Sequence, residues 1–242
     1  MARWAAPAAG ELHLWRAALD PTPDVLARLE ASLTEDERAR ATRFRFPRDR
    51  ARFAAGRGWL RELLAGYLDL APEEIRIVAG TYGKPRLGAG PVWLRFNASH
   101  SDGLAVFAVA RNREVGVDVE RIRPDFPIDE VAHHFYSARE QADLAALSEA
   151  DRLRAAFAVW TRKEAYLKAV GTGLALSLDA FDVTVRPGDP VRLHGHGGGA
   201  AQARRWSLHT VDLGPDYAAA VSVEGRPRMV PAKVRELSID LR

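Results

Sequence analysis

Two carboxylates set into an apolar, β-branched run constrain the fold of this chain more than any other feature. The run Gly116-Val117-Asp118-Val119-Glu120 has the composition and length of a strand. Side chains two apart on a strand point to the same face, so we expect Asp118 and Glu120 to share one. Two alternatives are open: the pair is simply solvated on an amphipathic strand, or a cation or a base holds the two like charges together.

A segment about forty residues later carries a base, Lys168, and a further carboxylate, Glu164. Trp160-Thr161-Arg162-Lys163-Glu164-Ala165-Tyr166-Leu167-Lys168 has helical periodicity, and Trp160, Glu164 and Lys168 recur every four residues on one stripe. An ordinary amphipathic helix with a Glu164–Lys168 pair, worth about 0.3 kcal/mol, also explains that stripe. If the helix packs on the strand, however, three carboxylates and a lysine meet. Such oxygen ligands suit a hard divalent cation that holds a phosphate group.

Composition bounds the class of protein. The chain has 242 residues, 47% of them hydrophobic and 28% charged, which is ordinary for one large or two small soluble domains. There is no cysteine, which excludes disulfides and thiolate zinc sites. Residues 1–10 lack the continuous apolar core of a signal peptide, and no stretch has the length of a transmembrane helix. We therefore expect a cytoplasmic protein that does not enter a membrane.

Arginines crowd the N-terminal half, although the formal net charge of the chain is only +3. So small an excess does not argue for nucleic acid, and we expect no nucleic-acid partner. Any one of these arginines is explained equally well by a solvated helical face. As a group they favour contact with an anion, either a phosphorylated small molecule or an acidic protein. They are Arg38, Arg40, Arg43, Arg45, Arg48, Arg50, Arg52, Arg57 and Arg61.

Helix and strand patterns alternate without regular βαβ periodicity, which favours an α+β fold over a doubly wound sheet. Strands are predicted at Leu12–Ala17, Ile75–Val78, Val92–Phe96, Leu104–Ala110, Val115–Val119, Phe181–Val185, Trp206–Val211 and Tyr217–Val223. Helices are predicted at Pro23–Ser32, Thr34–Thr42, Asp49–Leu68, Ile128–Phe135, Ala138–Ala146 and Asp151–Val170.

The two halves of the chain share an order of motifs: an aromatic pair, a helix with a basic residue and a tryptophan, a glycine-containing turn, and a strand. Each half then ends in a predicted hairpin, at Leu94–Ala110 and at Trp206–Val223. This order predicts a duplicated α+β unit, with an N-terminal half at 1–112, a C-terminal half at 113–225 and a peripheral tail at 226–242. Ligand sites often form at such interfaces, and the carboxylate strand begins directly after the boundary.

Three further segments have the composition of turns. Gly80-Thr81-Tyr82-Gly83-Lys84-Pro85 precedes a strand, and Phe96-Asn97-Ala98-Ser99-His100-Ser101 is predicted as the turn between two apolar strands. An ordinary structural turn explains both, except that it leaves His100 without a role. Gly195-His196-Gly197-Gly198-Gly199 lacks a following Lys-Ser or Lys-Thr, so we predict a hairpin tip there rather than a phosphate loop.

Taken in order, four of these motifs resemble those of the 4′-phosphopantetheinyl transferases of the larger, Sfp type. They are Gly-Lys-Pro, Asn-x-Ser-His-Ser, Gly-Val-Asp-Val-Glu and Trp-x-x-Lys-Glu-Ala-x-x-Lys, and the resemblance covers roughly Thr34 to Glu224. It implies two similar α+β halves related by pseudo-twofold symmetry, with the active site at their interface. It also implies transfer of the 4′-phosphopantetheine arm of coenzyme A to a serine of an apo acyl or peptidyl carrier protein, with release of adenosine 3′,5′-bisphosphate.

The resemblance implies a role for each motif residue. Asp118, Glu120 and Glu164 would hold Mg²⁺, or Mn²⁺, against the pyrophosphate of coenzyme A. Glu164 would also be the general base for the carrier serine, directly or through a water molecule, and Lys168 would stabilise charge on the departing phosphate. Lys163 would serve the helix or the rim of the pocket. The expected coenzyme contacts are Arg40, Arg52, Lys84, Pro85, Ser99, His100, Asp118 and Lys168.

The expected protein partner is acidic, because carrier proteins of this class carry acidic residues around the modified serine, and the N-terminal arginines would steer its docking. We expect the chain to act as a monomer. A noncatalytic coenzyme A or nucleotide-binding module is the alternative, and it predicts a damaged carboxylate set, which the sequence does not have. A nucleic-acid binder predicts stacking aromatics and a large charge excess, and the chain is nearly balanced.

Overall fold

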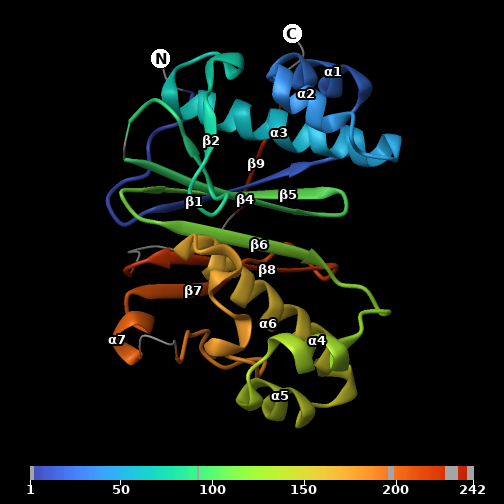
Figure 1. The fold of residues 1–242 in the computed structure, drawn as a ribbon, viewed down its shortest axis with the longest axis vertical. Helices are drawn as coiled ribbons and strands as arrows, with labels where there is room; N and C mark the ends of the chain where they lie inside the picture. The colour runs from blue at the N-terminus through green and yellow to red at the C-terminus, as the bar shows by residue number, and fades with distance from the viewer. Residues whose placement is uncertain (1–2, 92, 196–198, 227–233, 239–242) are drawn as a thin grey trace.

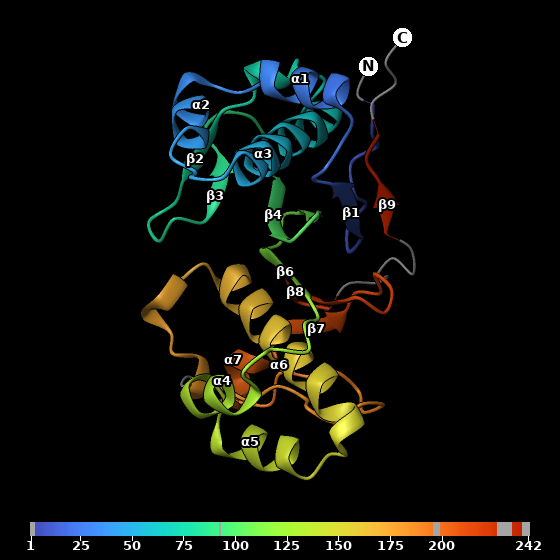
Figure 2. The same cartoon turned by 90° about the vertical axis from the view of Figure 1, so that its right-hand side faces the viewer.

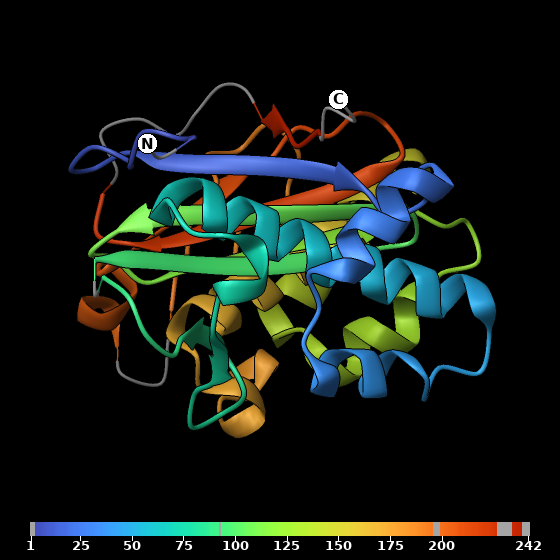
Figure 3. The same ribbon diagram turned by 90° about the horizontal axis from the view of Figure 1, so that it is seen from above.

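The structure is a computed structural model that describes residues 3–91, 93–195, 199–226 and 234–238. Helices and two main β-sheets alternate in four layers, helix–sheet–sheet–helix, as Figure 1 shows from top to bottom. Seen from above, the strands of both sheets run along roughly one direction, and helices lie over them (Figure 3). The α+β class predicted from the sequence is confirmed. None of the helices in the described ranges is long and apolar enough to cross a bilayer.

The first sheet has the strand order β4-β5-β1-β9, and its outer face is covered by helices. Strands β1 and β4 both pair antiparallel with β5, whereas β9 is parallel to β1. Its strands are β1 (Leu12–Ala18), β4 (Leu94–Ser101), β5 (Leu104–Arg111) and β9 (Arg235–Glu236). The helices are α1 (Pro23–Ala31), α2 (Glu35–Ala41) and α3 (Pro47–Leu68), and a small hairpin is made by β2 (Ile77–Ala79) and β3 (Pro85–Leu87).

The second sheet has the order β6-β8-β7 and is antiparallel throughout. Its strands are β6 (Val115–Arg121), β7 (Trp206–Thr210) and β8 (Tyr217–Glu224). The helices on its outer side are α4 (Ile128–Phe135), α5 (Ala138–Ala145), α6 (Glu149–Val170) and the short α7 (Ala200–Ala203). Helix α6 is capped at its N-terminus by Ser148, whose hydroxyl accepts from the Asp151 N–H, and at its C-terminus by Gly171, whose φ is 76°.

Successive side chains of a strand point to opposite faces of its sheet, so one strand contributes to the apolar core on both sides of the sheet. On β5, Ala105, Phe107 and Val109 pack toward α3, whereas Val106 and Ala108 pack between the two sheets. The same inter-sheet cluster contains Val115, Val117 and Val119 of β6 together with residues of β8. A third cluster lies between the second sheet and α4–α6. The apolar side of β6 thus holds it against the first sheet, and its other side, which carries the carboxylates, faces α6.

The predicted helices are confirmed within two residues at each end, and most strands are confirmed as well. The predicted turn at 96–101 is wrong, because those residues continue β4, which pairs with β5 as far as Ser101–Leu104. The turn is the dipeptide Asp102-Gly103, in which Asp102 takes a left-handed φ of 50°. Val92, where one predicted strand begins, and His196, Gly197 and Gly198 of the predicted glycine-rich tip lie outside the described residues.

Two further expectations differ from the structure. Phe181–Val185 forms no strand among the described residues; a single bridge joins Val183 to Leu193, because this segment runs along α6 instead of a neighbouring strand. The tail is not wholly peripheral, since β9 adds parallel to β1 and Leu237 is buried in the core of the first half at 4% exposure. The burial of Leu237 therefore holds the end of the described chain against the first sheet.

Candidate active site

The carboxylate strand lies at the seam between the two sheets. Figure 2 shows β4 and β6 next to each other where the upper and lower halves of the molecule meet, and side-chain hydrogen bonds join the two strands. Each strand is the edge of its own sheet. The face of β6 that carries Asp118 and Glu120 is turned toward α6, which presents Glu164 and Lys168.

Gly116 allows α6 to come this close. A Cβ at this position would lie 2.2 Å from both the Ala165 carbonyl oxygen and the Ala169 amide nitrogen. Real Cβ atoms never approach backbone so closely, so only glycine fits between strand and helix. The first residue of the Gly-Val-Asp-Val-Glu motif thus sets the separation of the two elements that carry the acidic and basic groups.

Asp118 is buried, at 3% exposure, and only one of its two oxygens has hydrogen-bond partners. Its Oδ1 accepts from Lys168 Nζ at 2.6 Å and from Ser99 Oγ at 2.8 Å, and Lys168 also donates to Ser99 Oγ at 2.9 Å. Its Oδ2 is buried without a partner among the described residues. Burial raises the pKa of Asp118, and Lys168 opposes the rise. A buried carboxylate oxygen left unpaired is costly unless a ligand completes it.

Glu120 and Glu164 reach the same cavity of about 350 Å³, whose walls also include Ser99, His100 and Trp160. Burial raises the pKa of Glu120 and of Glu164, and the neighbouring carboxylates raise both further. Burial lowers the pKa of His100, as does the Lys168 ammonium. These residues from three of the sequence motifs therefore line one cavity, and Lys168 pairs with Asp118 rather than with Glu164 four residues before it.

A second cavity of about 350 Å³ shares Ala98, Glu164 and Lys168 with the first and continues toward Lys84 and Pro85. Lys84 Nζ donates to Glu114 Oε2 at 2.6 Å and to the Ala169 carbonyl at 2.8 Å. Burial lowers the pKa of Lys84, and Glu114 opposes that change. The Gly-Lys-Pro motif therefore lies beside the C-terminal end of α6, next to the carboxylate cavity.

The two predicted arginine contacts line neither of these cavities. The Arg52 guanidinium donates to both oxygens of Asp20, at 2.8 and 2.7 Å, and to Asp102 Oδ1 at 2.5 Å. Arg40 is exposed and lies over the ring of Phe53. Further along α3, Arg57 and Arg61 pair with Glu37 of α2. The anions that the arginine-rich stretch was expected to contact are therefore, in part, carboxylates of this same chain.

Lys163 has a structural role, one of the two roles expected for it. Its side chain is fully buried, and Nζ donates to the Leu178 and Phe181 carbonyls at 2.6 Å each and pairs with Glu140 at 2.7 Å. It fastens the segment after α6 to the helix on the side away from the carboxylates.

The donor set fits a hard cation in chemistry, while the three carboxylates are not gathered around one point. Asp118, Glu120 and Glu164, which all carry carboxylate oxygens, line one cavity, and Asp118 Oδ2 has no hydrogen-bond partner among the described residues. Within the described ranges, no group of three or more His, Cys, Asp or Glu side chains is close enough together to hold a metal ion.

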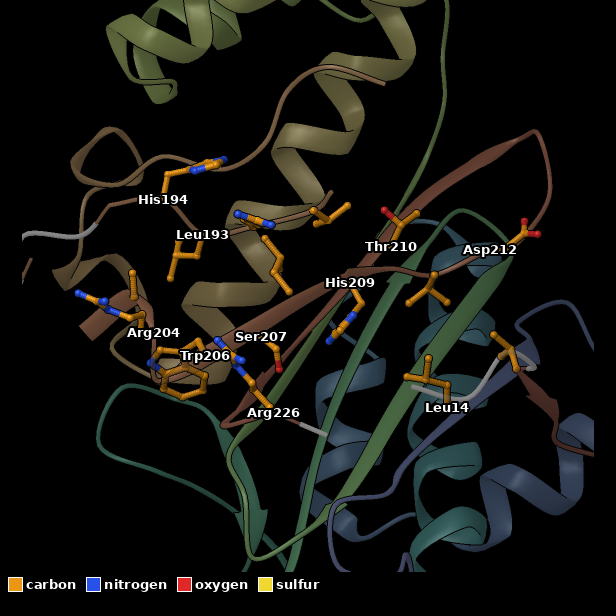
Figure 4. Close-up of a pocket in the computed structure, with 16 residues that line it drawn as sticks. Leu14, Leu193, His194, Arg204, Trp206, Ser207, His209, Thr210, Asp212 and Arg226 are labelled. Carbon is orange, nitrogen blue, oxygen red and sulfur yellow. The ribbon is translucent and has the colours of Figure 1, made fainter. Parts of the chain in front are cut away.

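A larger cavity lies elsewhere in the described part of the chain. It has about 1090 Å³ and runs along β7, between Trp206, His209 and Asp212 on one side and Leu193 and His194 on the other (Figure 4). None of the motif residues lines it. Size alone would favour this larger cavity. The smaller cavity, however, is lined by Lys168 and by Asp118, which has an unpaired oxygen, so the smaller cavity is the candidate active site.

Two residues of the site were not among the site residues predicted from the sequence. Ser101 Oγ donates to Glu120 Oε2 at 2.7 Å, and Asn97 Oδ1 accepts from the Val117 N–H at 2.9 Å. The sequence does contain a pattern that indicates their place: the polar residues Asn97, Ser99 and Ser101 recur at every second position, as residues on one face of a strand do. Assigning these residues to a turn concealed that alternation.

Comparison with known proteins gives one consistent result. The model of the 4′-phosphopantetheinyl transferase superfamily matches residues 114–222, and the model of the 4′-phosphopantetheinyl transferase N-terminal region matches residues 17–112. The 4′-phosphopantetheinyl transferase HetI of Nostoc sp. is 41% identical over 219 residues, which cover 89% of this chain and 88% of that protein. The 4′-phosphopantetheinyl transferase Sfp of Bacillus subtilis is 30% identical, covering 64% of this chain and 68% of that protein.

Among solved structures, a holo-(acyl-carrier-protein) synthase from Bacillus anthracis in complex with CoA is 20% identical, with a TM-score of 0.38. That match covers 46% of this chain and 96% of the other. Since the first relative spans nearly the whole chain and the two family models match both of its halves, the chain belongs to the 4′-phosphopantetheinyl transferase superfamily, in its Sfp-like type, and is an enzyme that transfers phosphopantetheine to carrier proteins.

Proposed function

We propose that this enzyme takes the 4′-phosphopantetheine arm from coenzyme A, attaches it to the serine hydroxyl of an apo acyl or peptidyl carrier protein, and releases adenosine 3′,5′-bisphosphate. The observation that carries the proposal is the cavity at the seam. There, Asp118, Glu120 and Glu164 surround a space beside Lys168, and a buried oxygen of Asp118 lacks a partner. The resemblance of the four motifs supports coenzyme A as the donor.

We assign Asp118, Glu120 and Glu164 as the residues that would hold Mg²⁺, with Mn²⁺ as a substitute, because hard cations prefer carboxylate oxygens. When bound, the cation would neutralise the pyrophosphate and make its β-phosphorus more open to attack. The unpaired Asp118 Oδ2 and the raised pKa of each of the three carboxyls support this assignment, since a cation would remove the cost of placing three acids together.

Glu164 is the proposed general base. It accepts the proton of the carrier serine, directly or through a water molecule, while the serine oxygen forms its bond to the β-phosphorus. The bond from that phosphorus to the departing adenosine bisphosphate breaks, and Lys168 stabilises the charge on the leaving phosphate. The raised pKa of Glu164 supports the role, because a carboxylate with a higher proton affinity is a stronger base.

His100, Ser99, Lys84 and Pro85 are the proposed contacts to the phosphates and the nucleotide of the coenzyme, since they line the two cavities that join at Glu164 and Lys168. Arg52 would bind a phosphate of the coenzyme only if that phosphate replaced Asp20 or Asp102 as its hydrogen-bond acceptor. Arg40 has no contact in the structure that supports a coenzyme role, and its assignment rests on the resemblance alone.

We further propose that the chain is built from two related halves that meet at residues 112–113. In the first half β1 and β4 flank β5, and in the second β6 and β7 flank β8, so that in each half the first strand pairs with the last. Helices α3 and α6 have 22 residues each and occupy corresponding places in the chain order. The two family models also meet there, ending at 112 and beginning at 114. The monomeric state and the cytoplasmic location stay predictions.

The direct test is incubation with coenzyme A, Mg²⁺ and a panel of apo-carrier proteins from fatty acid, polyketide and nonribosomal peptide pathways, followed by mass measurement of each carrier. We expect at least one carrier to gain the mass of one phosphopantetheine arm, and chelation of the metal with EDTA to prevent the gain. Tight binding of coenzyme A without a mass gain on any carrier would favour the noncatalytic module instead.

A further inference from the structure

We propose that Ser101 is a positioning residue, which holds one oxygen of Glu120 so that the other faces the cavity. The inference rests on the proposed metal-dependent function but concerns a residue to which that function assigns nothing. It begins with the open edge of β6. Ile122, just after that strand, donates its N–H to Asp216 on the β8 side. Since alternate residues of an antiparallel ladder face opposite ways, Val117 and Arg121 direct their N–H groups to the other edge, toward β4.

Side chains of β4 accept both of these N–H groups. Asn97 Oδ1 accepts from Val117 N at 2.9 Å, and Ser101 Oγ accepts from Arg121 N at 3.0 Å. Side chains instead of another backbone thus pair two of the N–H groups at this sheet edge. The arrangement also fixes the register of β4 against β6.

The bond from Arg121 has a second consequence for Ser101. Because the serine oxygen is already an acceptor, its own hydrogen is free for another group, and it donates to Glu120 Oε2 at 2.7 Å. Glu120 Oε1 makes no hydrogen bond in the described part of the chain. The hydroxyl therefore selects which carboxylate oxygen is left for a ligand.

Ser99, two residues earlier on the same face of β4, makes the corresponding hydrogen bond to Asp118. It donates to Asp118 Oδ1, and Oδ2 is left without a partner. Each serine of the Ser-His-Ser motif thus holds one oxygen of one carboxylate and leaves one oxygen free. Hydrogen bonds that orient metal-binding side chains typically change metal affinity by about 10- to 100-fold when removed.

The turn after β4 reinforces this geometry. Asp102 accepts from Arg52 of α3 and from Arg121 of β6, so it bridges the two halves directly beside Ser101. The main chain at Ser101 is thus held from both sides, and loss of the hydroxyl should alter the orientation of Glu120 without moving the strand.

The test compares Ser101→Ala with Ser101→Thr, which keeps the hydroxyl, and with Ser207→Ala as a matched control. Ser207 lies on β7 and donates to the Gly225 carbonyl at 2.6 Å, away from the carboxylates. Mn²⁺ binding in the presence of coenzyme A is measured by electron paramagnetic resonance, which needs no turnover, and thermal unfolding shows that each variant is folded. Transfer rates are then recorded as a function of metal concentration.

We expect Ser101→Ala to weaken Mn²⁺ binding about 10-fold, with the rate largely recovered at saturating metal, whereas Ser101→Thr and Ser207→Ala stay close to the parent protein. A folded Ser101→Ala variant that binds Mn²⁺ within twofold of the parent overturns the inference, even if transfer by the parent is normal. A parent that binds Mn²⁺ but modifies no carrier overturns the proposed function instead, and the binding comparison still decides the role of Ser101. A parent that binds no Mn²⁺ overturns both.

Discussion

Two buried acid–lysine pairs differ in whether the acid keeps an oxygen without a hydrogen-bond partner, and this separates a structural pair from the pair of the proposed active site. Glu140 has both oxygens occupied: Oε2 by Lys163 at 2.7 Å and the Ser137 N–H at 2.9 Å, and Oε1 by the Val183 N–H at 2.7 Å. Asp118 pairs with Lys168 at a similar distance, yet its Oδ2 has no partner. Burial raises the pKa of both acids. Only Asp118 has capacity left for a ligand, which supports its place in the reaction.

The nearly buried carboxylate of Glu37 gives a prediction at the same scale. Burial opposes its ionisation, but hydrogen bonds from Arg61 and Arg57 outweigh burial and lower the pKa of Glu37. A lowered folded-state pKa stabilises the fold above the unfolded value, and that contribution is lost as pH falls through the folded value. We expect Glu37→Gln to lose about 3 kcal/mol of unfolding free energy at neutral pH, because it leaves the buried charge of Arg61 without its carboxylate partner.

Denaturant titrations of Glu37→Gln and of the parent protein between neutral and acidic pH measure this difference. It should narrow as pH falls below the ordinary carboxyl range. The exposed Glu35→Gln on the same helix is the control and should stay within about 0.5 kcal/mol of the parent. If the difference in unfolding free energy between Glu37→Gln and the parent stayed constant down to strongly acidic pH, the ion pair would not explain the loss of stability.

At the scale of elements, the contact between β6 and α6 forms the site, and Gly116 controls it. A methyl group at this position would meet helix backbone at 2.2 Å, which cannot shift as a flexible side chain would. We expect Gly116→Ala to cost about 3 kcal/mol of stability and to separate Glu164 from Asp118, with a large loss of transfer. Chemical denaturation and the transfer rate measure the two effects.

Gly56→Ala on α3 is the matched control for that substitution. The nearest atom to its added Cβ is Leu19 Cδ2 at 3.5 Å, an ordinary contact, and alanine favours helix over glycine. We expect stability to be unchanged or higher by up to about 1 kcal/mol, with normal transfer. If the two alanine variants behaved alike, close approach of α6 would not be the reason for glycine in the motif.

The strand β6 and the helix α6 also show how much of the fold and of the candidate site could be predicted from the sequence. The long helix and the alternating strand are local patterns, so Glu164, Lys168, Asp118 and Glu120 were placed correctly from periodicity. Ser101 was missed because polar residues at the end of a strand resemble a turn, and only pairing with β5 shows that β4 continues to Ser101. The aspartates that hold Arg52 are distant in the chain, and no local pattern predicts such contacts.

At the scale of the whole molecule, the distribution of charge bears on the carrier partner. Arg52, Asp102 and Arg121 bring the first turns of α3 next to the end of β6, so the exposed arginines just before α3 and in its first turn lie on the side of the site. These are Arg43, Arg45, Arg48 and Arg50. They remain exposed, unlike Arg57 and Arg61, and are therefore free to steer an acidic carrier.

Charge reversal tests this steering. We expect the double substitution Arg45→Glu and Arg48→Glu to raise the KM for an acidic carrier about 5-fold at low ionic strength, with kcat and the KM for coenzyme A unchanged. The effect should shrink as salt is added, because exposed charges are screened. Arg139→Glu, an exposed arginine on α5, is the control and should have no such effect. Equal KM values for the double variant and the parent at low salt would exclude a docking role for these arginines.

The central claim is that the carboxylates at the seam carry out the transfer. The measurement that tests it most directly is the mass of a responsive apo-carrier after incubation with coenzyme A, Mg²⁺ and either the parent protein or Glu164→Gln. Glu149→Gln, an exposed position at the start of the same helix, serves as the control. We predict full modification by the parent and the control, and a rate at least about 100-fold lower for Glu164→Gln despite normal folding. Modification by folded Glu164→Gln at the parent rate would contradict the account.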